Sequence, residues 1–94
     1  MEALQGATLE LEILFNKALN AHQTGNLEAA QRIYKQVLTI DPNHAASWMN
    51  LGLTYYKLGS SDKALSALNR AKQLTPNHSA VHYNIGNIYM SQGA

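Results

Sequence analysis

The chain has 94 residues, 46% of them hydrophobic, and a formal net charge of +1 at pH 7. Seven lysines and arginines are scattered among six acids, which argues against a nucleic-acid partner, because phosphate recognition needs a basic stripe. No apolar run is long enough for membrane insertion, no signal peptide is recognisable, and the lack of cysteine excludes disulfides and thiolate metal sites. A cytoplasmic setting is therefore the default expectation.

Five helices are predicted. Residues 1–7 are expected to form a flexible arm, and apolar residues at helical spacing predict the first helix over residues 8–23. Gly25 then turns the chain, and Asn26 is expected to cap a second helix that ends before Pro42. The buried side chains of this second helix are predicted to be Ala30, Tyr34, Val37 and Leu38.

The third, fourth and fifth helices follow the same pattern. The third is predicted over residues 45–58 with Asn43 as its cap, and its inward side chains are Trp48, Leu51, Gly52 and Tyr55. The fourth ends before Pro76, and its inward side chains are Ala64, Leu68, Ala71 and Leu74. Asn77 is expected to cap the fifth helix, over residues 79–92.

A self-similarity of 34 residues runs through the chain. Asn16, Asn50 and Asn84 follow one another at intervals of 34 positions, and glycine, alanine, tyrosine and proline recur in the same register. Such a period is typical of helix–turn–helix units that stack and bury a continuous core between neighbours. The sequence therefore predicts an all-α fold of stacked antiparallel helical hairpins, forming a right-handed solenoid with one concave wall.

Two glycines, Gly52 and Gly86, lie inside predicted helices. Glycine in a helix interior costs about 1 kcal/mol relative to alanine, so each needs a structural reason. We expect Gly52 to approach Ala64 of the next helix closely, as Ala18 and Ala30 do in the first hairpin.

These residues resemble the tetratricopeptide repeat family. The second unit carries the family signature at Trp48, Leu51, Gly52, Tyr55, Gly59, Ala64, Leu68, Ala71 and Pro76. The first unit departs from it at Lys17 and Ala21, where a large apolar residue and an aromatic are usual, and the third has His82 where a large apolar residue is common. The implied repeats are residues 11–44 and 45–78 and a half-repeat of residues 79–94, within one domain of residues 8–94.

The resemblance implies a non-catalytic interaction module that binds a peptide or protein partner on the concave wall. The side chains expected to bind an extended peptide are Asn16, Asn50, Asn84, Phe15, Leu19, Met49, Leu53, Tyr56, Tyr83 and Asn87. A row of asparagine amides can donate and accept hydrogen bonds at once and so hold a peptide backbone. The pattern is similar to the asparagine ladder of O-linked N-acetylglucosamine transferases. In the alternative interpretation, the three repeated asparagines bond neighbouring helices or water and only keep the groove soluble.

Self-assembly is the second functional hypothesis. The fifth helix is expected to leave Val81, Ile85, Ile88 and Tyr89 without the partner helix of a complete repeat. Such an apolar patch indicates either a fragment of a longer array or a homo-oligomer in which two copies cover each other.

Four histidines are the only candidates for catalysis or metal binding. His78 and His82 are one helical turn apart, but no third ligand lies nearby in the sequence, and capping or linker contacts are the simpler role for His44 and His78. His22, on or near the concave rim, lacks an obvious orienting acid. We therefore expect no enzymatic activity, no catalytic residue, no metal site and no cofactor.

Overall fold

The computed structural model describes the backbone of residues 2–93 and the side chains of residues 6–93. This part of the chain forms five helices and no strand: α1 Glu2–Gln23, α2 Leu27–Ile40, α3 Ala45–Lys57, α4 Ser61–Leu74 and α5 Ser79–Ser91. The all-α prediction is confirmed. The expected arm of residues 1–7 is wrong from Glu2 onward, because the first helix already begins there; Met1 lies outside the described residues.

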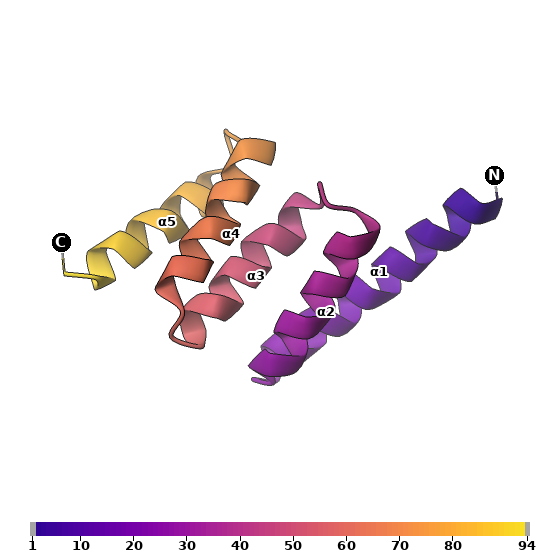
Figure 1. The fold of residues 1–94 in the computed structure, drawn as a ribbon, viewed down its shortest axis with the longest axis horizontal. Coiled ribbons are helices and arrows are strands. Elements are labelled where there is room, and N and C mark those ends of the chain that lie inside the picture. Colours follow the sequence, from indigo (N-terminus) through magenta and orange to yellow (C-terminus); the bar gives the residue numbers. More distant parts are fainter. Residues whose placement is uncertain (1, 94) are drawn as a thin grey trace.

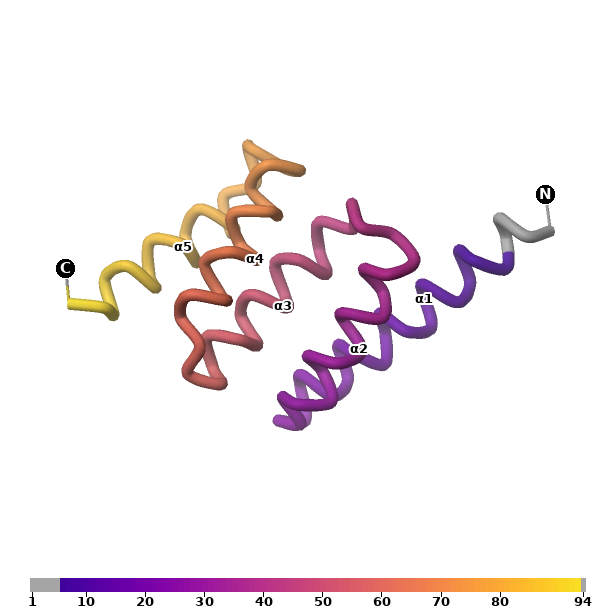
Figure 2. The backbone as a smooth tube through the Cα atoms, viewed as in Figure 1, coloured from indigo at the N-terminus to yellow at the C-terminus, as the bar shows by residue number. Residues whose placement is uncertain are grey.

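The five helices stack as antiparallel hairpins. Figure 1 shows α1, α3 and α5 running the same way through the molecule, while α2 and α4 run back in front of them. Each helix packs against its neighbours in sequence, and α3 also contacts α5. Traced as a tube (Figure 2), the stack has α1 and α5 at opposite ends, and it measures 50 × 29 × 17 Å. This arrangement confirms the predicted helical repeat architecture.

Glycine ends the first helix of each complete hairpin. Gly25 and Gly59 have φ angles of 83° and 88°, a left-handed conformation that glycine adopts without a Cβ clash. After Gly59, the backbone N–H of Ser60 donates to the carbonyl oxygen of Tyr55 at 2.9 Å, which is the long hydrogen bond of a Schellman motif. Past Gly25, the side-chain oxygen of Asn26 accepts an N–H of α2 at 3.4 Å, so the predicted cap of this helix is confirmed.

The predicted caps of α3 and α5 are wrong by one residue. The side chain of Asp41 accepts the backbone N–H of Asn43 at 3.0 Å, and this local turn places Asn43 before the helix. His44 is the cap instead, and its Nδ1 accepts a backbone N–H of α3 at 3.2 Å. His78 replaces Asn77 as the residue before α5, with no side-chain capping bond among the described residues.

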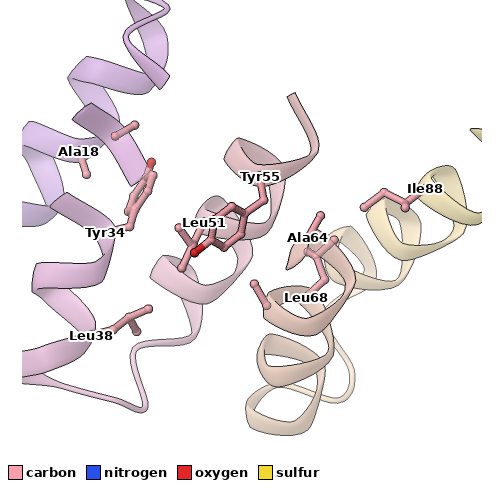
Figure 3. Close-up of a cluster of buried hydrophobic side chains, with 10 residues drawn as sticks. Ala18, Tyr34, Leu38, Leu51, Tyr55, Ala64, Leu68 and Ile88 are labelled. Carbon is pink, nitrogen blue, oxygen red and sulfur yellow. The ribbon is translucent and has the colours of Figure 1, made fainter. Parts of the chain in front are cut away.

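The core is continuous from one hairpin to the next. Tyr34 is fully buried and lies between Ala18 of α1 and Leu51 of α3 (Figure 3). The inward residues predicted for α2 are all buried, and so are those predicted for α4 except Leu74, which is partly exposed. The same cluster continues through Leu68 to Ile88 of α5. The repeats are therefore held together by burial between neighbours, as expected for a solenoid.

Gly52 lies where two helices meet closely. A Cβ atom added to it would lie 2.7 Å from Cγ of Leu68 and 3.1 Å from the carbonyl oxygen of Ala64. This confirms the predicted close approach. Gly86, at the same register on α5, has nothing within 4 Å of such an atom among the described residues.

The apolar patch expected on α5 is largely wrong. Val81 and Ile88 are each only 1% exposed, and Ile85 is partly buried against the core. The reason is that α5 packs this face on α4 and α3: Ile88 and Ile85 join the cluster around Leu68, and Val81 lies beside Ala46 and Met49. Of the four residues in that set, only Tyr89 is exposed, at 50%.

Candidate functional site

The ten predicted groove residues lie on the three helices that run in one direction, α1, α3 and α5. None is fully buried. The exposed members are Asn16, Tyr83 and Asn87, and the partly buried members are Phe15, Leu19, Met49, Asn50, Leu53, Tyr56 and Asn84. The structure therefore leaves all ten with some surface.

Several apolar members of this set also support the core. Those packed against the buried cluster are Phe15, Leu19, Met49 and Tyr56. The ring of Phe15 meets the ring of His44 edge-on, with centroids 4.8 Å apart, and lies 6.1 Å from the ring of Tyr34. Phe15 thus braces α1 against the start of α3 and offers only part of its ring to a ligand.

The three repeated asparagines differ in their hydrogen bonds. Asn50 donates from Nδ2 to the carbonyl oxygen of Ala46 at 3.0 Å, within its own helix. The side chains of Asn16 and Asn84 make no hydrogen bond within residues 6–93. An amide has two N–H donors and a carbonyl acceptor, so each of the three retains capacity for a ligand.

A small hollow lies between the N-terminal ends of α3 and α5. Its volume is about 220 Å³, and it is lined by Ala45, Ala46, Met49, Thr75, His78 and Val81. That volume suits one side chain and is below the usual size of a small-molecule site. Met49 alone among the lining residues belongs to the predicted groove set. Val81 was predicted only for the α5 patch and His78 only for a capping or linker contact, because the meeting of these residues depends on how the two helices cross.

A larger hollow, about 780 Å³, lies between α2, α3 and α4. It is lined by Lys35, Leu38, Thr39, Trp48, Leu51, Tyr55, Asp62, Lys63, Ser66, Ala67 and Arg70. Three of the seven cationic side chains of the chain line it, Lys35 from α2 and Lys63 and Arg70 from α4. The prediction that the cations do not cluster is therefore wrong for this surface, and no sequence pattern signalled it.

His22 is a structural residue and not an open groove side chain. Its Nδ1 lies 3.1 Å from the hydroxyl of Tyr34, and the two rings meet edge-on. Burial, and after it the charge of Lys57, lower the pKa of His22, while burial raises the pKa of Tyr34 to about 12. Both groups are therefore neutral at pH 7 and form one hydrogen-bonded pair between α1 and α2.

Acidification is expected to destabilise the fold through His22. The folded-state pKa lies below the ordinary 6.5, so the unfolded chain binds the proton more readily. The stability that neutral His22 contributes is complete above pH 6.5 and is lost as the pH falls from there through the folded pKa. Thermal melts followed by circular dichroism should show a smaller loss of melting temperature between about pH 7.5 and about pH 5 in His22→Gln than in the native chain. An equal loss in both proteins would contradict this assignment.

His82 takes the place of a tryptophan in the repeat. Trp48 donates from Nε1 to the carbonyl oxygen of Pro42 at 2.7 Å, and His82 donates from Nε2 to that of Pro76 at 2.6 Å. Both bonds span the same turn in successive repeats, which explains how a histidine fills this position. Within residues 6–93, no three histidine, cysteine, aspartate or glutamate side chains converge as metal ligands.

None of the helices within residues 2–93 is both long enough and apolar enough to traverse a lipid bilayer.

Comparisons with solved structures show the same architecture. MamA superposes with a TM-score of 0.85 at 22% identity, covering 88% of this chain and 48% of that chain. The Yersinia enterocolitica type III secretion chaperone SycD, in complex with a peptide of the translocator YopD, gives 0.86 at 19% identity, covering 89% and 64%. A mutant O-GlcNAc transferase of Thermobaculum terrenum gives 0.83 at 30% identity, covering 87% and 16%. The chain thus spans less than two thirds of each of these proteins.

No curated protein matches the sequence significantly. The sequence model described as "Tetratricopeptide repeat", however, matches residues 21–88, which is most of the chain. Together with the stacked hairpins, the close approach at Gly52 and the glycine turns, this match shows that the chain belongs to the tetratricopeptide repeat family.

Proposed function

We propose that this chain is a protein–protein interaction module that binds an extended peptide or partner segment along α1, α3 and α5. The observation that carries the proposal is the repeated asparagine register, in which the amides of Asn16 and Asn84 are unused by the rest of the described chain. An extended peptide presents unpaired N–H and C=O groups, which such amides can satisfy without regard to the peptide's side chains. The peptide in the SycD complex supports this proposal by analogy of fold.

Hydrogen bonds alone do not account for useful affinity. Each neutral hydrogen bond contributes about 0.5–1.5 kcal/mol, so three asparagines contribute about 2–4 kcal/mol. Micromolar binding requires about 8 kcal/mol. The remainder must come from apolar burial against Met49, Leu53 and Tyr83, and the hollow beside Met49 has room for one ligand side chain. In this proposal, the chain's activity is binding and not catalysis.

The test begins with selection of peptides from a random library against the native chain. Their affinities are then measured for a variant with Asn16→Ala, Asn50→Ala and Asn84→Ala. We expect binding to weaken at least several-fold, because about 2–4 kcal/mol of backbone recognition is removed. Helicity and melting temperature should barely change, since Asn16 is exposed and Asn50 bonds only its own helix.

The matched control removes three exposed amides from α2 and α4, through Gln36→Ala, Asn69→Ala and Gln73→Ala. This control should retain the affinity of the native chain. If the groove variant also retains it, the amides do not bind the peptide backbone, and the apolar side chains alone recognise the ligand. Loss of helicity in the groove variant would instead show that the asparagines are structural.

Self-association through α5 is a second candidate. It is favoured by the open surface at Gly86 and by the exposure of Tyr89 and Met90, at 50% and 78%. Because Val81 and Ile88 are buried, only part of the apolar surface predicted from the sequence is available for self-association. Sedimentation that depends on protein concentration would be its signature.

A further inference from the structure

The large hollow between α2 and α4 lies on the opposite side of α3 from the proposed peptide groove. Trp48, Leu51 and Tyr55 line it, whereas Met49, Asn50 and Leu53 project from the other side of the same helix. Its volume, about 780 Å³, is within the range of ligand-binding clefts. We call it the interhelix groove. Binding there is independent of the function proposed above, so either proposal can fail without the other.

The interhelix groove has an apolar floor. Leu38, Leu51 and Ala67 are buried beneath it, and Trp48 is partly exposed. Tyr55 is 9% exposed, and its hydroxyl has no hydrogen-bond partner within residues 6–93. A floor of this kind suits a large aliphatic or aromatic side chain, with one hydroxyl ready to bond a polar group beside it.

The rim of the groove is cationic. Lys35 of α2 and Lys63 of α4 each place Nζ 5.8 Å from the centre of the Tyr55 ring, on which the two charges converge. Arg70 is held by the side-chain oxygens of Asn43 and Gln73, at 3.1 and 3.2 Å.

None of these three cations has a carboxylate partner within residues 6–93. Asp62 is the one acid among the lining residues. The groove therefore carries a surplus of positive charge, although the chain as a whole is nearly neutral.

We propose that the interhelix groove binds an acidic peptide segment that carries a large apolar side chain. Its carboxylates would pair with Lys35, Lys63 and Arg70, and its apolar side chain would bury against the floor. An anion between the two lysines also relieves their mutual repulsion, which a neutral ligand cannot do. A nucleic acid fits less well, because its phosphates need an extended row of cations, whereas these three surround one compact apolar floor.

Trp48 provides a built-in reporter, since it is the chain's only tryptophan and lines this groove. The probe is a capped five-residue peptide with a central leucine between two pairs of glutamates. Titration into the intact chain should change the Trp48 fluorescence and the indole N–H resonance in a saturable way, and added salt should weaken binding. A peptide with glutamines in place of the glutamates should bind at least tenfold more weakly. Equal binding of the two peptides would overturn the proposal.

Charge reversal locates the site. Lys35→Glu with Lys63→Glu should weaken binding of the acidic probe at least tenfold. The control, Lys17→Glu with Lys72→Glu, changes the net charge equally at two exposed lysines outside the groove and should weaken it less than twofold. Equal weakening in both variants would show that only overall charge matters and would refute the site.

Circular dichroism checks that the variants fold. If the charge reversal unfolds the chain, the variant Lys35→Gln with Lys63→Gln replaces it. We expect this variant to bind the acidic probe at least fivefold more weakly. An unchanged affinity would refute the site. A ten-nucleotide oligothymidine serves as the competing nucleic-acid ligand. Displacement of the peptide by this oligonucleotide at equal or lower concentration would assign the groove to nucleic acid and overturn the proposal.

Discussion

Replacing Tyr34 with alanine is expected to lower the free energy of unfolding by about 3–5 kcal/mol, the usual cost of removing a buried aromatic ring. Tyr34 is fully buried, its ring lies 6.1 Å from that of Phe15, and its hydroxyl pairs with His22. It therefore joins α2 to α1 and, across the hairpin boundary, to α3. A domain of this size has only about 5–15 kcal/mol to lose, so the variant should be partly unfolded at physiological temperature. Urea denaturation followed by circular dichroism measures the change.

Two controls separate the ring from its surroundings. Tyr34→Phe keeps the ring and loses only the bond to His22, so it should cost about 0.5–1.5 kcal/mol. Tyr83→Ala removes a tyrosine that is 69% exposed and should change stability by less than about 0.5 kcal/mol. If Tyr34→Ala costs no more than Tyr34→Phe, the ring does not join the two hairpins as described.

Opposite effects are expected from the same substitution at two equivalent glycines. Gly52→Ala should lower the free energy of unfolding by about 1–2 kcal/mol, because overpacking against Leu68 and the Ala64 backbone outweighs the gain in helix propensity. Gly86→Ala meets no atom within 4 Å in the described chain and should raise stability by about 0.5–1 kcal/mol. For a domain of this size, the two melting temperatures should differ by roughly 10 °C or more.

A double-mutant cycle tests the cause at Gly52. Leu68→Ala alone should cost about 2–5 kcal/mol, because it removes a fully buried side chain. Combined with Gly52→Ala, it should cost less than the sum of the two single changes, since Cγ of Leu68 no longer opposes the new methyl group. Strict additivity would show that the loss at Gly52 has another origin, such as the contact with the Ala64 carbonyl.

The repeat period alone determined the architecture of this protein. A spacing of 34 residues implies equivalent hairpins, and apolar residues at helical spacing identify the buried side chains of α2 and most of those of α4. Gly52 could be assigned to a close contact because a helix interior tolerates glycine only at a cost. These features depend on local propensity and on a repeated pattern, which are written directly in the residues.

Tertiary structure decided what happens between elements. Asn43 was expected to cap α3, but Asp41 bonds its backbone and His44 takes that role. Val81 and Ile88 are buried because α5 packs this face against α4 and α3, and the period does not specify which face of a terminal helix is covered.

The interhelix groove and the hydrogen-bonded pair of His22 and Tyr34 are also products of the tertiary structure. Lys35 and Lys63 come together only because α2 and α4 both pack against α3, so that each lysine reaches the ring of Tyr55. Periodicity places each residue on a face of its own helix, whereas these contacts depend on how two helices cross, and that angle is set by side-chain packing throughout the core.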